Sequence, residues 1–346
     1  MVNGETLRFK RAVIATGARP AIPEIPGLED AGYLTSETVF ELTECPRSLL
    51  VIGGGPLGCE LAQVFCRLGC HVSIAQDEPL FLRQEERDAA QILSAALARD
   101  GIDIHLNTQT TGLKTKGGQK IVDLQTDDYS TTIAVDAILV GTGRTPNVQG
   151  LNLEAAGIEY DSESGIRIND FSNQGIYATG DVCSEHRFAH IEGASAHIVT
   201  QNALFLGRQK LSAMTIPWCT FTDPEIAHVG MYVTEAREKY IPVKTIAVPM
   251  HEVDRAVADG EEEGFVKIHV QEGTDRIIGA TVVARHAGEM ISFISLAITA
   301  GIGLRELARV SHPYPTQAAI KMAANVLARA PRSRFHAWCA RKWLAW

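Results

Sequence analysis

The sequence has no long apolar run and no excess of basic charge. None of its apolar stretches reaches the roughly 18 to 20 residues that a membrane-spanning helix needs, and the opening residues MVNGETLRFK contain no apolar signal-peptide core. Its 41 Asp and Glu outnumber its 32 Lys and Arg, and the resulting net charge of −9 offers no basic surface for nucleic acid. We therefore expect a cytoplasmic protein with no membrane span and no nucleic-acid partner.

The sequence also has no regular cysteine framework. It has seven cysteines, and an odd number without a repeated spacing does not fit the disulfide pattern of a secreted domain. Cys66 and Cys70 stand four residues apart at the end of a predicted helix, where thiols usually serve in packing. We expect reduced thiols at all seven positions, which are 45, 59, 66, 70, 183, 219 and 339.

What is present is enough apolar sequence for several cores. The 346 residues are 45% hydrophobic and 21% charged, which is typical of two or three globular domains and excludes a disordered or fibrous chain. The clearest signal is a βαβ unit, with a strand at 48–52, a helical pattern that Gly69 ends and a second strand at 71–75.

The turn of this unit has the spacing Gly53-x-Gly55-x-x-Gly58. Gly53 permits a tight turn, Gly55 lets backbone N–H groups approach a pyrophosphate, and Gly58 lets the helix pack closely on the strand. The spacing alone is a weak signal, and a tight turn without a ligand is the alternative interpretation. Because the motif follows a strand and opens a helix, it predicts dinucleotide binding.

The end of the second strand bears on the choice of cofactor. A carboxylate is expected there to bind the ribose hydroxyls of NAD, but the sequence has Gln76 followed by Asp77. A neutral amide removes a repulsion against a 2′-phosphate that is on the order of 4 kcal/mol at ~4 Å and an effective dielectric constant of about 20. Gln76 therefore favours NADPH slightly, and which of the two side chains faces the ribose stays open.

Apolar strands that end in glycine recur on both sides of the βαβ unit, at 12–15, 136–140 and 175–178, which suggests two related nucleotide-binding folds. The segment 21–44 is rich in Pro and Gly and is interpreted as a connection. Beyond residue 215 the pattern changes to that of an antiparallel sheet. The predicted elements are helices near 86–100, 194–205, 288–300 and 316–328 and strands near 217–222, 244–248, 264–270 and 277–283.

Five ordered motifs resemble those of the class I pyridine nucleotide-disulfide oxidoreductase family. They are Ala15–Pro20, Gly53–Glu60, Gly141–Asn147, Gly175–Asp181 and His312–Thr316, and they extend over essentially the whole chain. Tyr314 and the stretch Gln76–Leu82 are most similar to the mercuric reductase-like branch.

The resemblance implies an α/β flavoprotein with Rossmann-like FAD- and NAD(P)-binding domains and a carboxy-terminal α+β dimerisation domain. It implies an FAD-dependent NAD(P)H oxidoreductase that passes a hydride from NAD(P)H to FAD and electrons on to a small-molecule acceptor, and it implies a homodimer. The expected divisions are an FAD-domain remnant at 1–46, an NAD(P)-binding domain at 47–146, a second FAD-binding segment at 147–214 and the dimerisation domain at 215–346.

The resemblance also assigns site residues. For NAD(P) they are Gly53, Gly54, Gly55, Pro56, Leu57, Gly58, Glu60, Gln76, Thr110 and Gly143. For FAD they are Thr16, Gly17, Ala18, Asp181, Arg187, Phe188, Ala189 and His190. Tyr314 is the expected catalytic residue, and no metal site is expected because His190, Glu192 and His197 are interpreted as polar residues near the start of a helix.

Three departures from the family pattern stand out. The sequence has no amino-terminal flavin turn and no Cys-x4-Cys, so we expect an amino-terminally truncated chain whose strand at 12–15 has an unpaired edge. Tyr314 stands at the position of the acid-base histidine of disulfide reductases, and the glutamate that orients that histidine has no clear counterpart. The end of the chain, Trp343–Trp346, has no cysteine pair.

These departures leave two alternatives open. Beside the oxidoreductase function, the chain is interpreted as a non-catalytic nucleotide-binding and dimerising fragment, or as half of a split enzyme whose FAD domain an upstream polypeptide completes. The tail at 332–346, with three tryptophans and several cations, is interpreted as packing over the dimerisation domain in preference to lying on a membrane surface.

Overall fold

The computed structural model describes residues 8–168, 175–184, 187–205, 207–318, 320 and 322–323. It divides the chain into two compact units. Unit 1 comprises Met1–Gly58, Val72–Asp77 and Asn107–Met214, and unit 2 comprises Cys59–His71, Glu78–Leu106 and Thr215–Trp346. The four-part division expected from the sequence stays a prediction.

A buried parallel pair of strands in unit 1 is part of the sheet that includes the βαβ strands. Strand β3 (Ser48–Ile52) pairs in parallel with β9 (Ala137–Val140), and β4 (His71–Ala75) lies on the other side of β3. Leu49, Leu50 and Val51 have no exposed surface, as expected for a strand covered on both faces. Helix α2 (Pro56–Arg67) connects β3 to β4, and the predicted βαβ order is confirmed.

An antiparallel sheet in the same unit packs on the segment 21–44. Its order is β6-β7-β8, and α1 contacts β6. The interpretation of 21–44 as only a connection is wrong, because Leu28 is 1% exposed in the core and Leu34 forms a parallel bridge with Leu139. The bounds are α1 (Leu28–Ala31), β6 (Gln109–Lys116), β7 (Gln119–Gln125) and β8 (Ser130–Val135).

The remaining strands of unit 1 join segments far apart in sequence. β1 (Ala12–Ile14) pairs in parallel with β13 (Ile176–Ala178), and β2 (Ala18–Pro20) pairs antiparallel with β10 (Arg144–Pro146). Among the described strands β13 is the only partner of β1. Helix α4 (Ala189–Leu204) begins five residues before the predicted start at 194. Two short strands, β11 (Tyr160–Asp161) and β12 (Gly165–Ile166), pair antiparallel.

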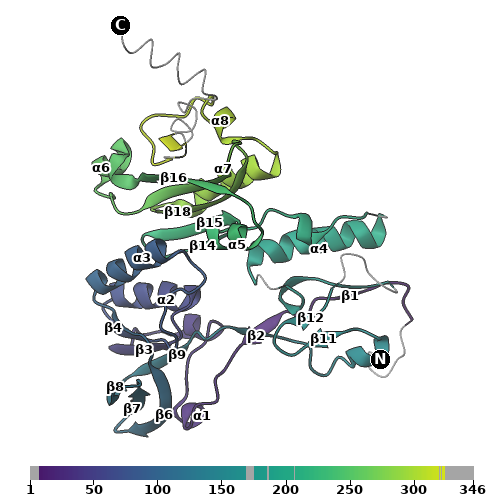
Figure 1. Ribbon diagram of the computed structural model, residues 1–346. Helices are drawn as coiled ribbons and strands as arrows, with labels where there is room; N and C mark the ends of the chain where they lie inside the picture. The colour runs from purple at the N-terminus through teal and green to yellow at the C-terminus, as the bar shows by residue number, and fades with distance from the viewer. Residues whose placement is uncertain are drawn as a thin grey trace. The chain divides into compact units, whose positions relative to one another are not determined.

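Unit 2 contains a five-stranded antiparallel sheet in the order β14-β15-β18-β17-β16, which confirms the antiparallel pattern predicted beyond residue 215. Helix α7 packs on β14, β15 and β18 (Figure 1). The bounds are β14 (Pro217–Thr220), β15 (Glu225–Gly230), β16 (Val243–Pro249), β17 (Phe265–Gln271), β18 (Ile277–Ala284) and α7 (Ala287–Thr299). Of the helix predicted at 316–328, the greater part lies outside the described residues, as does the tail at 332–346.

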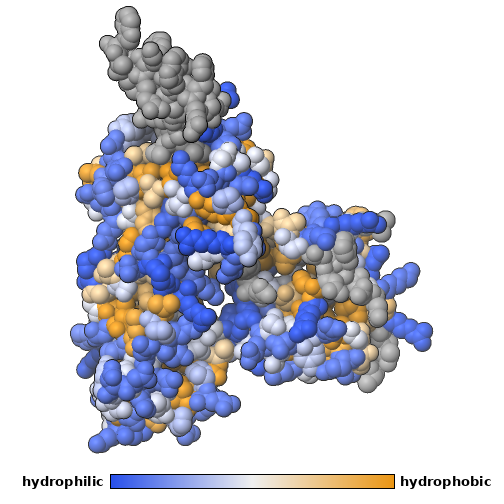
Figure 2. Space-filling model, viewed as in Figure 1, coloured by the Kyte–Doolittle hydropathy of each residue, from blue (hydrophilic) through white to orange (hydrophobic). Residues whose placement is uncertain are grey.

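The other helices and strands described in unit 2 are most of α2, α3 (Arg87–Asp100), β5 (Asp103–His105), α5 (Val233–Glu238), α6 (Asp254–Asp259) and α8 (Leu304–Leu307). Hydrophilic side chains cover much of the visible surface, with apolar patches between them (Figure 2). No helix within the described ranges is both long enough and apolar enough to cross a bilayer.

Candidate functional site

The glycine turn, residues Gly53–Gly58, has the geometry that the spacing predicted at two of its three glycines. Gly53 has φ +103°, and a Cβ there would lie 2.7 Å from the carbonyl oxygen of Gly141. A Cβ on Gly58 would lie 2.1 Å from the carbonyl oxygen of Gly53, so only glycine lets the helix pack this closely. At Gly55 a Cβ would meet no atom within 4 Å, which leaves space beside the turn.

The start of α2 adds a favourable charge to that space. Pro56 and Leu57 are its first residues, and proline suits this position because its missing N–H would have no helical partner. The free N–H groups of the first turn and the helix dipole favour an anion. The open space at Gly55 and the helix start are the features that suit an anion such as a pyrophosphate.

Gln76 extends its side chain to the glycine turn. Its Oε1 accepts a hydrogen bond of 2.6 Å from the Gly54 N–H, and its Nε2 donates to Asp77 Oδ1 at 3.3 Å. Because the amide oxygen is occupied by the backbone, Nε2 is the polar group that Gln76 retains for a ligand. The amide of Gln76 is thus bound to the glycine turn, an orientation that the sequence alone does not determine.

The other residues assigned to NAD(P) are more dispersed. Glu60 Oε1 accepts a hydrogen bond of 2.7 Å from the Phe221 N–H, and burial raises the pKa of Glu60. The hydroxyl oxygen of Thr110 is buried and has no hydrogen-bond partner among the described residues. Gly143 has φ +124°, and its carbonyl oxygen accepts from the Ala21 N–H at 2.9 Å.

Two of the family motifs, Ala15–Pro20 and Gly141–Asn147, are joined by direct hydrogen bonds. Thr16 Oγ1 donates to the Asn147 carbonyl oxygen at 2.7 Å, and Asn147 Nδ2 donates to the Thr16 carbonyl oxygen at 2.9 Å. The Asn147 N–H donates to the Gly17 carbonyl oxygen at 2.9 Å, and Arg19 donates to Asn147 Oδ1 at 3.0 Å. Asn147 therefore fixes the backbone of the turn after β1, where FAD contacts are expected.

Asp181 is a buried carboxylate, and only one of its two oxygens has a hydrogen-bond partner in the described structure. It is 3% exposed, and its Oδ2 accepts from Arg144 Nε at 3.0 Å, while Oδ1 is buried without a hydrogen-bond partner in the described structure. Arg144 is itself held by the Ala18 carbonyl oxygen at 2.7 Å. A buried carboxylate oxygen without a donor is costly, so it fits a hydroxyl group of a bound ligand such as the flavin ribityl chain.

The stretch 187–190 leads into α4. The guanidinium of Arg187 donates to the carbonyl oxygens of Arg144 and Glu163, and its Nε is buried without a partner among the described atoms. Phe188 precedes the helix and stacks with His190 at a ring distance of 5.6 Å, and Ala189 is the exposed first residue. Two backbone carbonyls thus orient the guanidinium of Arg187, and its Nε–H is the donor that could bind a ligand.

Four of the described cysteines lie in environments that disfavour the reactive thiolate form. Burial and the nearby Asp181 raise the pKa of Cys183 to about 11, and burial also raises the pKa values of Cys59, Cys66 and Cys219. Cys66 donates to the Asp100 carbonyl oxygen at 3.1 Å. Raised pKa values disfavour the thiolate at neutral pH, which agrees with the packing role expected of Cys66.

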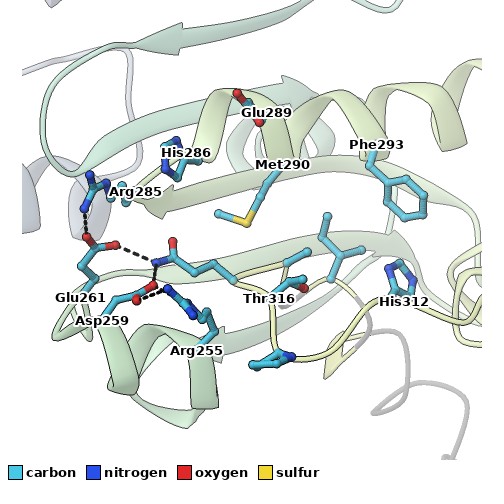
Figure 3. Close-up of a pocket in the computed structure, with 14 residues that line it drawn as sticks. Arg255, Asp259, Glu261, Arg285, His286, Glu289, Met290, Phe293, His312 and Thr316 are labelled. Carbon is cyan, nitrogen blue, oxygen red and sulfur yellow. Dashed lines mark hydrogen bonds and ion pairs between the residues drawn. The ribbon is translucent and has the colours of Figure 1, made fainter.

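Tyr314 lies in unit 2 beside a cavity. Its side chain is 80% exposed, and its hydroxyl donates to Asp254 Oδ2 at 2.9 Å. The neighbouring residues of its segment line a cavity of about 760 Å³ together with α6 and α7 (Figure 3). On one side of this cavity Gln317 Nε2 donates to Asp259 Oδ2 and Glu261 Oε2 at 3.0 and 2.7 Å.

Sequence reasoning did not identify three of the residues that organise these sites. Arg144 and Asn147 lie within the motif Gly141–Asn147, so the sequence carries a signal for their positions. Asp254 lies 60 residues from Tyr314, and its partnership with Tyr314 had no signal in the sequence.

Known proteins resemble the chain over most of its length. Residues 1–197 match the pyridine nucleotide-disulphide oxidoreductase family, and residues 216–324 match the pyridine nucleotide-disulphide oxidoreductase dimerisation domain. Mercuric reductase from Staphylococcus aureus is 35% identical over 327 residues, covering 93% of this chain and 60% of that protein. Dihydrolipoyl dehydrogenase from Thermus scotoductus is 33% identical, covering 91% of this chain and 69% of that protein.

Solved structures agree with this assignment. The HOCl-induced flavoprotein disulfide reductase RclA from Escherichia coli superposes with a TM-score of 0.83 at 28% identity, covering 92% of this chain and 73% of that chain. LpdA from Mycobacterium tuberculosis superposes with a TM-score of 0.83 at 30% identity, covering 92% and 69%. The chain spans about 60% of the length of the Staphylococcus aureus relative. By its two matched domains and these relatives, the chain belongs to the pyridine nucleotide-disulphide oxidoreductase family.

Proposed function

We propose that this chain acts as an FAD-dependent NAD(P)H oxidoreductase that delivers electrons to a small-molecule acceptor. The observation that carries the proposal is the glycine turn, where Gly53 and Gly58 admit no side chain and Gly55 faces open space at a helix start. When bound, FAD supplies the redox chemistry, taking a hydride from NAD(P)H and passing electrons to the acceptor. The protein supplies binding and orientation.

For FAD, we propose that Asp181 and Arg187 bind polar groups of the cofactor. Each has a buried polar atom without a partner in the described structure, and those atoms are Asp181 Oδ1 and Arg187 Nε. The carboxylate oxygen accepts from a hydroxyl, and the guanidinium Nε–H donates to an oxygen or nitrogen acceptor. Thr16, Gly17 and Ala18, fixed through Asn147, and the residues Phe188, Ala189 and His190 complete the proposed contacts.

For the nicotinamide cofactor, we propose a preference for NADPH over NADH. Gln76 carries no charge, and its Oε1 is held by the Gly54 N–H, so the group available to the ribose is the Nε2 donor. A donor can bind a 2′-phosphate oxygen, whereas a carboxylate at this position would repel it. The proposed contacts also include Gly54, Pro56, Leu57, Glu60, Thr110 and Gly143.

For the assembly, we propose a homodimer formed through residues 215–346, with residues 47–146 binding NAD(P) and residues 1–46 and 147–214 binding FAD. The match of residues 216–324 to a dimerisation domain supports this division. Tyr314 is the proposed catalytic residue, because its segment lies at the surface of that domain and its side chain is 80% exposed.

The proposal is tested by adding FAD and NADPH to the purified chain. We expect bound FAD to give the flavin absorbance band at roughly 450 nm, and this band to bleach on adding NADPH. A chain that binds NADPH in calorimetry but retains no FAD, and shows no bleaching when FAD is supplied, would contradict the oxidoreductase proposal.

The cofactor preference has its own test. We expect Gln76→Glu to weaken NADPH binding by tenfold or more, on the order of 1.4 kcal/mol, and to change NADH binding little, because only NADPH carries the repelled phosphate. Calorimetry of both cofactors measures the effect. Asp77→Asn is the matched control, and if it improves NADPH binding while Gln76→Glu changes nothing, Asp77 is the residue that faces the ribose.

A further inference from the structure

The described structure gives Tyr314 an acidic partner that lies far away in the sequence. Asp254 is the first residue of α6, and its Oδ2 accepts the Tyr314 hydroxyl at 2.9 Å. No carboxylate follows Tyr314 within its own segment, since Pro315, Thr316 and Gln317 come next. The acid that supports this side chain therefore comes from a different element.

The segment that contains Tyr314 makes a second contact with the same region of unit 2, through Gln317. Gln317 Nε2 donates to Asp259 Oδ2 at 3.0 Å and to Glu261 Oε2 at 2.7 Å. Asp259 is ion-paired with Arg255 at 2.6 Å, and Glu261 is ion-paired with Arg285 (Figure 3). Gln317 therefore binds two carboxylates that are themselves held by arginines. Together with the bond from Tyr314 to Asp254, this restrains the segment from Tyr314 to Gln317 at both of its ends.

The direction of the hydrogen bond determines what Tyr314 offers to a ligand. A phenol has one proton and two lone pairs, and this proton is donated to Asp254. The phenolic oxygen therefore keeps its lone pairs as acceptors, on a residue that is 80% exposed. The bond to Asp254 favours one orientation of this exposed ring over its other rotamers.

We propose that Asp254 is the positioning residue for Tyr314, holding its hydroxyl so that the oxygen faces an incoming acceptor with lone pairs. This inference rests on the proposed function, in which Tyr314 takes the place of the family's acid-base histidine. It deepens that function, because a group that presents lone pairs selects an acceptor with a positive centre or a hydrogen-bond donor over an anion.

The hydrogen bond and the negative charge of Asp254 have a measurable effect on Tyr314 itself. They raise the pKa of Tyr314 above its ordinary value, with a smaller contribution from burial. Removing the charge at residue 254 should therefore let Tyr314 ionise at a lower pH. This readout needs no turnover, so it separates the positioning role from the proposed function.

The experiment labels the seven tyrosines of the full chain with 13C at Cζ and follows their ionisation by NMR. The signal of Tyr314 is identified by its loss in Tyr314→Phe. We expect its titration midpoint to fall in Asp254→Asn and to return toward the original value in Asp254→Glu. Asp259→Asn is the matched control on the same helix, and we expect it to shift the midpoint less than Asp254→Asn does.

Turnover provides the second measurement. If the chain oxidises NADPH, we expect Asp254→Asn and Tyr314→Phe to lower kcat/KM for the acceptor, and the double variant to lose no more than Tyr314→Phe alone. An unchanged midpoint in Asp254→Asn would overturn the inference even in an active enzyme. A shifted midpoint in a chain without turnover would uphold the contact and count against the proposed function.

Discussion

Gly55 and Gly58 differ in what a single methyl group would meet. At Gly58 the added carbon would lie 2.1 Å from the backbone oxygen of Gly53, and a backbone atom cannot move aside as a flexible side chain can. At Gly55 the same carbon would meet nothing within 4 Å. Gly58 is therefore needed for the fold, whereas Gly55 is needed only if a ligand occupies the space beside it.

This difference predicts opposite results for two matched variants. We expect Gly58→Ala to lower the free energy of unfolding by about 1–3 kcal/mol, because it overpacks the contact between helix and strand. We expect Gly55→Ala to stay within about 0.5 kcal/mol of the original chain but to weaken NADPH binding. Urea unfolding and calorimetry measure the two quantities. If Gly55→Ala binds NADPH as tightly as the original chain, the pyrophosphate does not approach this glycine.

His228 is a buried histidine whose state depends on pH. It has no exposed surface, its Nδ1 lies 2.9 Å from Thr281 Oγ1 and its Nε2 lies 3.0 Å from the Gly230 carbonyl oxygen. Its ring stacks on that of Tyr232 at 3.7 Å. Burial lowers the pKa of His228 to about 4, so the folded chain keeps this ring neutral.

The lowered pKa predicts a loss of stability in mild acid. Between the ordinary histidine pKa of about 6.5 and the folded value, the unfolded chain binds a proton that the folded chain does not, so the free energy of unfolding falls as the pH falls. The full effect is about 3 kcal/mol. Urea unfolding at pH 7, 6 and 5 measures it. His228→Gln should show a shallower dependence on pH, and an equal slope in both chains would contradict the assignment.

At the scale of elements, α2 is joined to the end of α3 and to the segment before β15 by one buried amide. Gln63 is 4% exposed, and its Nε2 donates to Asp100 Oδ2 and to the Asp223 carbonyl oxygen, both at 2.9 Å. Its Oε1 accepts from the Asp223 N–H at 2.7 Å. Arg67 bridges the same two aspartates, but its side chain is 48% exposed.

Burial decides which of these two connections stabilises the protein. We expect Gln63→Ala to lower the free energy of unfolding by about 2–3 kcal/mol, because it leaves buried polar groups without partners. We expect Arg67→Ala to cost about 0–1 kcal/mol, because solvent screens exposed ion pairs. Thermal or urea unfolding of both variants provides the comparison. Equal losses would indicate that the ion pairs, and not the amide, connect these elements.

The elements that the sequence predicted well are those with a strong apolar period. The βαβ unit combined two apolar strands with a glycine turn, and all three parts are present. Strand β15 was missed because its buried residues include His228, which breaks an apolar pattern although it is fully buried. The start of α4 was placed too late, because Gly193 and the polar residues before it hide the helical spacing.

For the candidate sites, the turn residues were predictable and the side-chain partners were not. The roles of Gly53 and Gly58 follow from spacing, because sterics alone impose them. The bonds from Gln76 to the Gly54 N–H and from Tyr314 to Asp254 join residues 22 and 60 positions apart. Such contacts depend on tertiary packing, and no periodicity in the sequence reports them.

At the scale of the whole molecule, the matched dimerisation domain predicts association. We expect sedimentation to give a mass of twice 37.5 kDa, because residues 216–324 match that domain and α7 exposes Leu296 at 62%. The mass should fall toward that of one chain on dilution. Leu296→Asp tests whether this face contributes, and a mass of 37.5 kDa for the original chain at micromolar concentration would contradict the homodimer.

The pairing of β1 with β13 has a consequence for biosynthesis. Ala12 pairs with Ile176, which stands 164 positions later in the sequence. At roughly 5–20 residues per second, β1 emerges about 8–33 s before its partner exists. During that interval we expect its apolar side chains to be accessible to a chaperone, and among them Val13 stays 50% exposed in the described fold. The order of translation thus makes β1 among the last of the described strands of unit 1 to be paired, although it precedes the other described strands in the sequence.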